Sequence, residues 1–406
     1  MNIWIFNHYA VGPNSIGITR HYDLAKELTL LGHNVTIFAS SFNHQKREEE
    51  QDYNKNEYCI KRNYNGVDFY WIKTPKYQKN DQKRILNMFL YTYRANRIAM
   101  NVKEVPDIVI GSLMHPLAAI LGYKIAKKKK AKFYFEERDL WPQSLIDLGK
   151  VSKNSLLVKA LAKLELFLYK KADKIIVLFD KAPQYVKQRG ITGEKIIYLP
   201  NGVDLNRYKA MDELPNPHFE VLEGLKSKFL IVYTGAHSLA NYLEAMIDIA
   251  VEVNKHSKVI HFLLVGDGPE KDSIIKETEK RNLKNVTFLP PIQKEYIPTI
   301  LNYADAGIIT MRNAEVYKWG ISLNKMFDYM AASLPIFMLS NLKDTVITTH
   351  NLGIVTDEVD EIANKILAVN KDSDLLKELS YNSYKYGSEN HTWKRLAKKL
   401  ESHFGK

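Results

Sequence analysis

The sequence predicts an α/β protein built of two doubly wound domains, each a parallel sheet covered by helices on both faces. Short apolar runs alternate with longer stretches of helical periodicity along the whole chain, which is typical of βα units in parallel sheets. The chain has 406 residues, enough for two or three domains. The alternation breaks near Asn201, so the strands divide between two sheets.

Apolar runs mark the expected strands in order along the chain. In the first sheet they cover residues 3–6, 35–38, 68–72, 108–110, 132–135, 174–178 and 196–199. In the second sheet they cover residues 229–233, 261–265, 286–289, 306–309, 335–338 and 353–355. The stretches 20–31 and Leu156–Lys171 repeat apolar residues every three or four positions, which predicts helices that pack one face on a sheet.

The break near Asn201 sets the predicted domain boundary. We expect an N-terminal domain at residues 1–200, a C-terminal domain at 201–385, and a last helix within 386–406 that packs back toward the N-terminal domain. Ligands of doubly wound sheets bind beyond the carboxyl ends of the strands. Two such domains that face each other across a cleft should place their functional residues in loops that follow strands.

Composition and charge narrow the class of protein. Hydrophobic residues make up 45% and charged residues 26% of the chain, as in an ordinary globular protein. The single cysteine excludes an internal disulfide and thiolate metal sites, and the absence of a basic leader or a bilayer-length apolar stretch predicts a cytoplasmic protein. Residues 1–200 contain 33 Lys and Arg against 19 Asp and Glu, and the remainder contains 25 against 27. Such a basic half attracts nucleic acid, an anionic membrane or a phosphorylated substrate.

Three loops that follow strands of the first half contain candidate residues. Gly17 precedes a helix start, where backbone amides favour an anion, although an ordinary turn is the alternative. His115 could hydrogen-bond a sugar hydroxyl or stabilise developing charge, or it could simply pack. Arg138 could bind a phosphate in bidentate fashion or pair with a neighbouring carboxylate. His33 precedes a strand, at the other edge of the sheet, and is interpreted as structural.

The most informative loop of the second half precedes a predicted helix that begins at Asn324. Its backbone N–H groups and the ammonium of Lys325 form a natural diphosphate site, and Asp328 lies one turn further, within reach of a ribose diol. A plain amphipathic helix would explain the apolar residues of this segment but not these three polar ones. Gly235 permits close backbone approach after an earlier strand, and His237 could point into the cleft.

Missing motifs limit the chemistry further. The sequence contains no GxxxxGK[ST] phosphate loop, no HExxH helix and no GxSxG elbow. Asp372 and Asp374 form its only aspartate–any–aspartate triplet, in the context of a helix start, which indicates a cap. We therefore expect amides and basic side chains to hold a diphosphate without a metal or a cofactor.

Taken together, these loops resemble those of glycosyltransferase family 4, a large retaining family with the GT-B fold of two Rossmann-like domains. The resemblance covers nearly the whole chain. It is closest to the bacterial surface-polysaccharide branch that includes N-acetylfucosaminyltransferase-like enzymes of O-antigen and capsule synthesis. The matching phrases are TRHYDLAKELTLLGHNVTIFAS, EERDLWPQSLIDLG, EKIIYLPNGVDLNRY, LLVGDGPEKDSI and SLNKMFDYMAASLPI, which start at Thr19, Glu136, Glu194, Leu263 and Ser322.

The resemblance implies that the C-terminal domain binds a nucleotide-sugar donor, most often a UDP-sugar in this branch. Asp328 takes the place of the family's second acidic residue, which contacts the ribose, and Asn324 and Lys325 precede it in the diphosphate loop. Gly235 matches the glycine near the phosphates, with His237 beside it. The donor site is thus expected in the loops of one domain.

Further positions follow from the same resemblance. Pro291 and Ile292 match the loop beside the base. The N-terminal domain would hold the acceptor, with Gly17 in the loop over the donor phosphate and His115 near the family's histidine on the donor sugar.

The sequence departs from the family in four places. The second acidic residue is a shorter Asp, and the first loop has Ser15-Ile16-Gly17 where relatives are richer in glycine. Gly320 stands eight residues before Asp328, where the family has its first acidic residue, and Glu315 could contact the donor sugar from farther back. Ala236 and Asn241 replace the usual basic pair after the phosphate glycine. Neutralisation of the diphosphate is therefore expected to depend more heavily on Lys325, on amides or on Arg138.

The resemblance also implies a reaction and its partners. Lys325 would stabilise the departing nucleoside diphosphate, whose phosphate takes the acceptor's proton, so we assign catalytic roles to Lys325 and His115. The basic helices at 81–97 and Leu156–Lys171 could dock on the anionic inner leaflet and bring a polyprenyl-diphosphate-linked acceptor to the enzyme, or they could pack on the sheet with a solvated lysine face.

Rival functions are a sugar-nucleotide epimerase of GT-B shape and a non-catalytic nucleotide- or glycan-binding partner subunit. A nucleic-acid-binding protein would explain the charge, but the sequence lacks a recognition helix or a stacking platform. We therefore expect no nucleic-acid partner.

Overall fold

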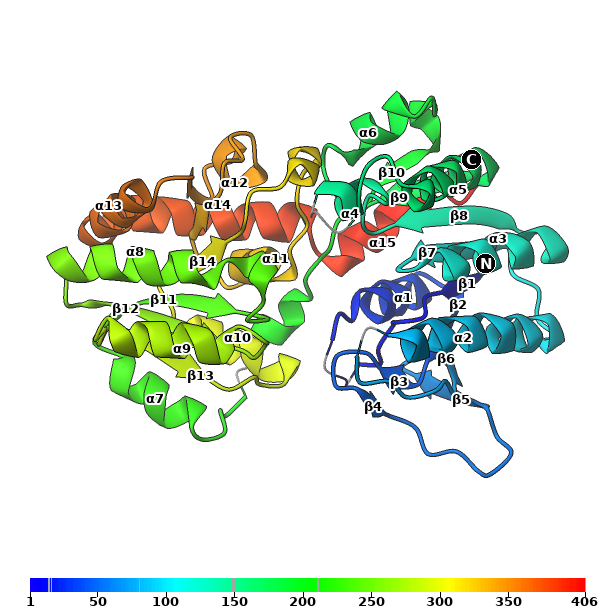
Figure 1. Cartoon of the computed structure of the whole chain (residues 1–406), viewed down its shortest axis with the longest axis horizontal. Coiled ribbons are helices and arrows are strands. Elements are labelled where there is room, and N and C mark those ends of the chain that lie inside the picture. Colours follow the sequence, from blue (N-terminus) through cyan, green and yellow to red (C-terminus); the bar gives the residue numbers. More distant parts are fainter. Residues whose placement is uncertain (14, 16, 80, 148–150, 210–211, 406) are drawn as a thin grey trace. The chain divides into compact units, whose positions relative to one another are not determined.

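The computed structural model divides the chain into two compact units (Figure 1). The structure describes residues 1–405 except 14, 16, 80, 148–150 and 210–211. The N-terminal unit comprises Met1–Pro200, Trp319–Ile321 and Trp393–Lys406, and the C-terminal unit comprises Asn201–Lys318 and Ser322–Thr392. Each unit has a parallel sheet with helices on its faces, so the predicted fold class is confirmed.

The N-terminal unit is built on an eight-stranded sheet in the order β10-β9-β8-β7-β1-β2-β6-β5. Neighbouring strands are parallel except β5, which runs antiparallel to β6. All seven strands predicted for this sheet are present, because strands covered on both faces have continuous apolar runs. The strands are β1 (Asn2–Phe6), β2 (Asn34–Ser40), β5 (Cys59–Tyr64), β6 (Val67–Ile72), β7 (Ile108–Leu113), β8 (Lys132–Glu137), β9 (Lys174–Val177) and β10 (Ile196–Tyr198).

The edge strand β5 has no counterpart in the predicted strands. Its residues are mostly polar or charged, and Ile60 is its one buried side chain. Asn65 and Gly66, both with positive φ (51° and 87°), join it to β6 in a tight hairpin turn. A short ribbon of β3 (Phe42–Asn43) and β4 (Glu48–Glu49) is a second addition. Apolar runs alone therefore miss the strands of this unit that lie outside its buried centre.

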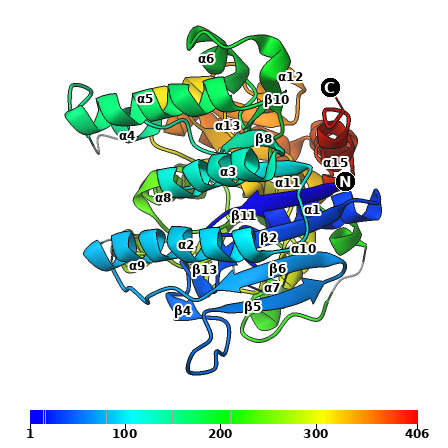
Figure 2. The ribbon, with the colours of Figure 1, turned by 90° about the vertical axis from the view of Figure 1, so that its right-hand side faces the viewer.

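Helices cover both faces of this sheet. A layer of α2, α3 and α5 lies on one face (Figure 2), and α1 packs with α15 on the other. Each crossover helix starts after the carboxyl end of a strand, so the helix N-termini gather at that edge of the sheet. The helices are α1 (Arg20–Leu30), α2 (Gln82–Asn101), α3 (Pro116–Lys129), α4 (Gln143–Asp147), α5 (Leu156–Lys171), α6 (Ala182–Gln188), the 3₁₀ turn η1 (Gly193–Lys195) and α15 (Trp393–Glu401).

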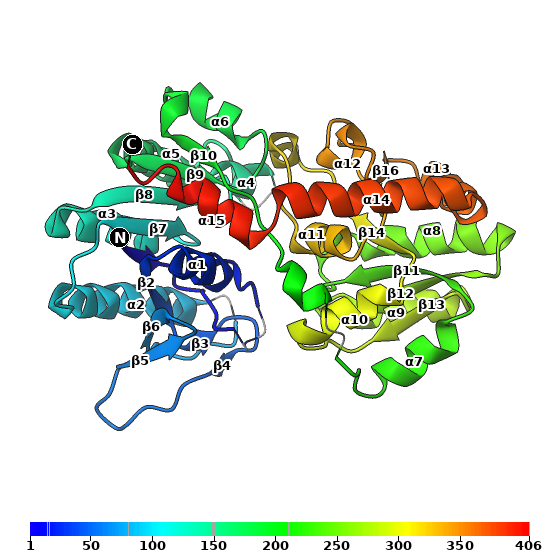
Figure 3. The ribbon, with the colours of Figure 1, turned by 180° about the vertical axis from the view of Figure 1, so that it is seen from behind.

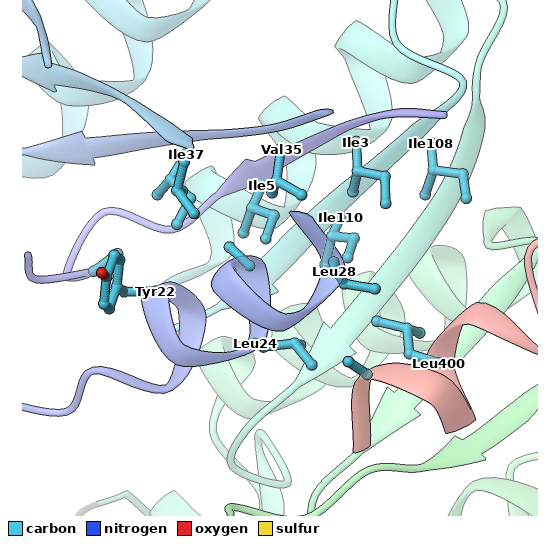
Figure 4. Close-up of a cluster of buried hydrophobic side chains, with 14 of the residues drawn as sticks. Ile3, Ile5, Tyr22, Leu24, Leu28, Val35, Ile37, Ile108, Ile110 and Leu400 are labelled. Carbon is cyan, nitrogen blue, oxygen red and sulfur yellow. The ribbon is translucent and has the colours of Figure 1, made fainter. Parts of the chain in front are cut away.

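The core of the N-terminal unit lies between the central strands and the pair α1 and α15. Alternate residues of each strand point to one face, so isoleucine and valine side chains of three strands form one apolar layer. Leucines of α1 and α15 pack against this layer (Figure 4). The labelled members are Ile3, Ile5, Val35, Ile37, Ile108 and Ile110 on the strands and Tyr22, Leu24, Leu28 and Leu400 on the helices. This layer fixes the start of α1 at the carboxyl edge of the sheet.

The C-terminal unit contains a six-stranded parallel sheet in the order β13-β12-β11-β14-β15-β16. All six predicted strands are present within a residue or so of their expected ends. They are β11 (Phe229–Thr234), β12 (Ile260–Val265), β13 (Val286–Leu289), β14 (Ala306–Thr310), β15 (Ile336–Leu339) and β16 (Gly353–Thr356). The order reverses between β11 and β14, which is where ligands of open parallel sheets bind.

Helices again cover both faces of the second sheet. The helix α8 packs with α13, and α14 runs alongside α11 (Figure 3). The helices are α7 (His218–Leu225), α8 (Leu243–His256), α9 (Lys271–Lys280), α10 (Ile297–Asn302), α11 (Asn324–Ala331), α12 (Val346–Thr349), α13 (Val359–Lys371) and α14 (Ser373–Asn390), with the 3₁₀ turns η2 (Leu205–Tyr208), η3 (Leu239–Asn241), η4 (Lys294–Tyr296) and η5 (Glu315–Trp319).

One glycine sets how closely α11 lies on the sheet. A Cβ built on Gly307 of β14 would stand 2.3 Å from the ring of Tyr329. The Tyr329 hydroxyl accepts a hydrogen bond from the backbone N–H of Thr234 (3.1 Å), at the end of β11. Tyr329 thereby holds α11 close on β14 and bonds it to the carboxyl end of β11.

The end of the chain differs from the predicted boundaries. The predicted limit at residue 385 falls inside α14, which continues to Asn390 and whose Gly387 lies close against Met330 of α11. The expected last helix within 386–406 is therefore the end of α14 followed by a separate helix, α15, which packs on α1. Within the described part of the chain, no helix is long and apolar enough to cross a membrane.

Candidate functional site

The first turn of α11 is open to a ligand. Leu323 stands at the N-cap in extended conformation, and no side chain caps the helix. The first N–H groups of a helix have no partner within it, and its dipole adds partial positive charge there. The loop before it is anchored, since the Asn201 side chain donates to the Ser322 carbonyl at 2.8 Å and the Ser322 hydroxyl accepts from the Asn201 backbone at 2.9 Å. The free backbone N–H groups of the first turn are therefore held in a fixed position, beside the exposed side chain of Asn324.

Lys325 adds an ammonium group to this turn. Its ammonium lies 3.2 Å from Oδ1 of Asn241 and 3.9 Å from the centre of the Tyr233 ring. No carboxylate pairs with it among the residues that the structure describes. Burial therefore lowers the pKa of Lys325 to about 7. A phosphate placed here would meet an ammonium whose charge the protein leaves unbalanced.

Glycines bring two backbone loops close to this lysine. Gly235 follows β11 with φ of 146°, and a Cβ at that position would lie 3.2 Å from Nζ of Lys325. Gly268 follows β12 with φ of 158°, and its Cβ would lie 2.2 Å from the carbonyl oxygen of His237. Larger residues at either glycine would separate the loops or cover the ammonium. Gly235 thus lies beside Lys325, and its place near a donor phosphate stays a prediction.

His237 lies buried under these loops. Both of its ring nitrogens lack a hydrogen-bond partner among the described residues. Burial, helped by the charges of Lys271 and Lys325, lowers the pKa of His237 to about 4. The imidazole is therefore neutral near pH 7 and has both a donor and an acceptor to offer. Lys271 itself is engaged, since its ammonium donates to the carbonyl oxygens of Gly266 (2.7 Å) and Leu289 (3.1 Å).

Asp328 lies on the next turn of α11 and has a partner that the sequence did not indicate. The hydroxyl of Tyr208, in η2, donates to its Oδ1 at 3.0 Å. Burial and the neighbouring Asp328 raise the pKa of Tyr208, so the hydroxyl remains a donor. The two residues are 120 positions apart in the chain, which is why no local pattern links them. The carboxylate of Asp328 is held in place on the same helix as Lys325.

The predicted base loop follows β13. Pro291 is exposed and Ile292 half-buried. The ring of buried His218, at the start of α7, donates through Nε2 to the carbonyl oxygen of Pro290 at 3.0 Å. This bond fixes the path of the chain just before the two predicted residues.

Among the described residues, no hydrogen bond or ion pair joins Glu315 to those around Lys325. The Glu315 side chain is 77% exposed and pairs with Lys318 at 3.3 Å. Gly320 belongs to the N-terminal unit, where its φ of 101° and the Asp180 carboxylate beside it leave no room for a side chain. A contact of Glu315 with a donor sugar stays a prediction.

His115 is buried in the N-terminal unit and bonded to a second histidine. Its Nε2 lies 2.7 Å from Nδ1 of His8, and His8 stacks on Tyr91 at a ring distance of 4.3 Å. Burial lowers the pKa of His115 to about 3 and that of His8 well below its usual range. Both rings are therefore neutral at pH 7. His8 was missed by the sequence reasoning, although it follows β1 as His115 follows the adjacent β7.

The two remaining predicted residues lie in the same unit. Gly17 has φ of 142°, and a Cβ there would lie 3.1 Å from the side chain of Val11. Arg138 is buried just beyond β8. His33, interpreted as structural, bonds to Glu401 at 3.0 Å. Within the described ranges, no group of three or more His, Cys, Asp or Glu side chains is placed to hold a metal ion.

Comparison with known proteins identifies the class of protein to which the chain belongs. Residues 17–207 match the sequence family described as Glycosyltransferase Family 4, and residues 218–386 match the family described as Glycosyl transferases group 1. Together the two matches span most of the chain. The chain therefore belongs to the GT-B glycosyltransferases that combine these two domains, and it is a glycosyltransferase.

Curated relatives are distant. The chain is 21% identical over 315 residues to WcaI of Escherichia coli (strain K12), described as a colanic acid biosynthesis glycosyl transferase, with 74% of each chain covered. It is 22% identical over 280 residues to the glycosyltransferase WbjE of Pseudomonas aeruginosa, with 67% of each covered.

Solved structures share the fold over the full length. Sucrose-phosphate synthase of Thermosynechococcus elongatus superposes with a TM-score of 0.72 at 14% identity, covering 99% of this chain and 97% of that one. HepE of Anabaena, in complex with UDP, gives 0.68 at 14% identity, with 99% and 98% covered. WaaG, a glycosyltransferase of lipopolysaccharide biosynthesis, gives 0.62 at 15% identity, with both chains fully covered. At these identities the likeness establishes the fold.

Proposed function

We propose that the enzyme transfers an N-acetylated hexosamine or deoxyhexosamine, with retention, from a UDP-sugar to a polyprenyl-diphosphate-linked glycan in the synthesis of O-antigen or capsule. The observation that carries this proposal is the unbalanced ammonium of Lys325 beside the uncapped start of α11. A relative is named for colanic acid synthesis, and a structural neighbour contains UDP. Both support the choice of polymer and nucleotide.

The donor site is assigned to the loops of the C-terminal unit. Lys325, the first amides of α11 and the backbone at Gly235 bind the diphosphate, with Asn324 at its edge. The carboxylate of Asp328 accepts hydrogen bonds from the ribose hydroxyls. Neutral His237 supplies a hydrogen bond to the phosphate or the sugar.

The base and the acceptor side complete the assignment. The chain at Pro291 and Ile292 borders the base. In the N-terminal unit the backbone at Gly17 approaches the donor phosphate. His115 contributes a neutral hydrogen bond from Nδ1 to a donor-sugar hydroxyl, since its other nitrogen is taken by His8.

The chemistry assigned to these groups is stabilisation of the leaving group. As the bond from the anomeric carbon to the diphosphate oxygen breaks, negative charge grows on that oxygen, where Lys325 and the amides are already oriented. The leaving phosphate then takes the proton of the acceptor hydroxyl, which attacks from the same face. No protein side chain is needed as a base in this sequence of events.

The decisive experiment joins binding to turnover. Thermal unfolding with UDP-, GDP- and dTDP-sugars identifies the nucleotide, because a ligand at ~100 Kd adds ~2.7 kcal/mol of stability. We expect UDP-sugars to stabilise the protein and an N-acetylated sugar to be transferred to a prenyl-diphosphate-linked glycan. Stabilisation by UDP-sugars without any transfer would favour a partner subunit. Conversion of the donor to an epimer without an acceptor would favour an epimerase.

A membrane surface is proposed as the second partner. Helix α2 exposes Ile85 (54%), Leu86 (50%) and Phe89 (56%), and the first turn of α5 exposes Leu156 (84%) and Leu157 (56%). Both groups lie in the first half of their helices, on the same layer of the N-terminal unit (Figure 2). Exposed apolar side chains among lysines and arginines suit an anionic leaflet that carries a lipid-linked acceptor.

Liposome flotation tests this surface. We expect the protein to float with vesicles that contain anionic lipid and to be released by high salt. Replacement of Phe89 and Leu156 by Ser should abolish flotation, and the same change at exposed Leu239, in the C-terminal unit, serves as the control. Equal flotation of wild type and double variant would contradict the proposal.

A further inference from the structure

A group of charged side chains lies at the carboxyl edge of the sheet in the N-terminal unit. Glu136 is the second-last residue of β8, Arg138 follows the end of that strand, and Arg20 and His21 open α1. We call these four residues the Arg138 cluster. They come together because the core layer under α1 fixes the start of the helix at this edge (Figure 4).

Three members of the cluster hold one another. The carboxylate of Glu136 accepts hydrogen bonds from Nε of Arg20 at 2.9 Å and from Nε2 of His21 at 2.6 Å. The other guanidinium nitrogens of Arg20 donate to the carbonyl oxygens of Leu199 (2.8 Å) and Pro200 (2.6 Å). The one carboxylate of the cluster is thus fully engaged, and Arg20 has the bonds of an arginine that holds the fold together.

Arg138 differs from Arg20 in its contacts, although its charge also acts on Glu136 and helps to lower the pKa of that carboxyl. Its side chain is buried, with 8% of the residue exposed, and its Nε is shielded from water without a hydrogen bond. No hydrogen bond or ion pair reaches it from the described residues. It lies close enough to Arg20 and His21 to lower the pKa of each, together with their burial. His21 is therefore neutral near pH 7, and the cluster has two cations against one anion.

Ser112 is a second unsatisfied group at this corner. It pairs with Glu136 across β7 and β8, is fully buried, and its Oγ has no partner among the described residues. Paired residues of neighbouring parallel strands point to the same face of the sheet. The hydroxyl therefore lies on the side of the sheet where the cluster lies.

We propose that Arg138 binds a phosphate group, and that in the working enzyme this phosphate belongs to the lipid-diphosphate acceptor. The buried Nε–H of Arg138 has no acceptor, which is unfavourable, and an anion would supply one. The planar guanidinium fits two phosphate oxygens at once. The acceptor as the source rests on the proposed function. The donor diphosphate, to which the sequence analysis assigned Arg138, has the same chemistry, so the experiment separates the two sources.

The experiment compares two probes by calorimetric titration of the full chain. Farnesyl diphosphate represents the acceptor and UDP the donor. For Arg138→Gln we expect at least a tenfold loss of affinity for farnesyl diphosphate and less than a twofold change for UDP. Arg138→Lys keeps the charge but cannot bind two phosphate oxygens as the planar guanidinium does, so its loss of affinity for farnesyl diphosphate should be smaller. Arg62→Gln, at an exposed arginine of β5, is the matched control and should change neither affinity.

Each other outcome decides against a part of the proposal. A tenfold loss of affinity for UDP, with the affinity for farnesyl diphosphate unchanged, would overturn the acceptor assignment. It would show that Arg138 binds the donor diphosphate. No loss for either probe would overturn the phosphate site. Thermal unfolding separates binding from folding. Removal of an unpaired cation should leave the unfolding temperature of Arg138→Gln unchanged or raised, whereas removal of a structural arginine would lower it and contradict the proposal.

Inorganic pyrophosphate distinguishes this proposal from the proposed function. Its binding is measured in a Lys325→Ala background, which removes the ammonium of the donor site. Pyrophosphate should still bind there, and its affinity should fall at least tenfold on addition of Arg138→Gln. That result together with no transfer to a prenyl-linked glycan would leave the pocket intact and reject the acceptor class. If pyrophosphate bound equally well to Lys325→Ala with and without Arg138→Gln, the pocket itself would be rejected.

Discussion

Arg20 in the N-terminal unit and Lys325 in the C-terminal unit are both cations held away from water, but their partners differ in charge. Arg20 meets the carboxylate of Glu136 and two backbone carbonyls. Lys325 meets an amide oxygen and the face of a tyrosine ring, and no carboxylate among the described residues. The first balances a charge inside the fold. The second keeps its charge for a group that the chain does not supply.

The contrast shows that partners, rather than burial, separate a structural cation from a binding one. Removal of one member of a buried pair leaves the other uncompensated, which destabilises the protein. Removal of an unpaired cation deprives only its ligand. Arg138 follows Lys325 in this respect and differs from its neighbour Arg20.

The largest effect is expected for Arg20→Met, which keeps the bulk of the side chain but leaves Glu136 with His21 alone. We expect the free energy of unfolding to fall by ~3–5 kcal/mol, the usual range for a broken buried pair. Urea unfolding followed by circular dichroism measures it. Arg62→Met, at an exposed arginine, should change it by no more than ~0.5 kcal/mol. A loss for Arg20→Met as small as that of the control would remove the contrast.

Lys325→Ala should have the opposite profile. We expect transfer to slow by ~2.7–4 kcal/mol of activation free energy, the range for one lost preorganised donor, because the leaving diphosphate loses its ammonium. The unfolding temperature should stay the same or rise. Initial rates at saturating donor and acceptor measure the first effect. Lys276→Ala, at an exposed lysine of α9, should change neither quantity, and normal rates in Lys325→Ala would reject the donor site.

The sequence was informative where one local pattern carries the structure. All thirteen predicted strands exist because buried parallel strands are continuous apolar runs. The start of α11 was predicted at Asn324 because polar residues interrupt an otherwise apolar helix. The polar edge strand β5 has no such run, although the Asn65–Gly66 dipeptide that turns it back is a hairpin signal that could have found it.

Partnerships between distant residues were beyond the sequence. Arg138 could pair with a carboxylate or bind a phosphate, and nothing local decides between these uses. In the structure the nearby Glu136 accepts its hydrogen bond from Arg20, 116 positions away, and Arg138 acts on this carboxylate only through its charge. His8 and His115 meet across 107 positions in the same way. Such pairings depend on strand order in the sheet, which one sequence does not contain.

A smaller effect is expected from pH. The pKa of Lys325 is about 7 in the folded protein, so its protonated fraction falls about tenfold between pH 6 and pH 8, or ~1.4 kcal/mol. UDP affinity should fall by that factor in calorimetric titrations. Lys325→Arg stays charged and corrects for the titration of UDP itself. Equal pH dependence in both proteins would contradict the assignment.

The same shift has a consequence for stability with the opposite sign. Lys325 has its proton in the unfolded chain up to pH ~10.4 but loses it near pH 7 in the folded one, so the unfolded state binds more protons between these values. Its contribution to the free energy of unfolding therefore rises with pH in that window. Lys325→Met should lose this rise when urea unfolding is compared at pH 7 and pH 9.

The smallest effect is expected for Tyr208→Phe, which removes the hydroxyl that donates to Asp328 at 3.0 Å. Tyr208 acts on the donor only through Asp328, so the loss should be one hydrogen bond, ~0.5–1.5 kcal/mol of UDP affinity. It should be absent with inorganic pyrophosphate, which has no ribose. Tyr303→Phe removes a similar bond to Glu223 (2.7 Å), elsewhere in the unit, and is the control. A bond that only orients Asp328 toward the ribose leaves the diphosphate contacts intact. If the affinities for pyrophosphate and UDP fell equally, Tyr208 would instead support α11 as a whole.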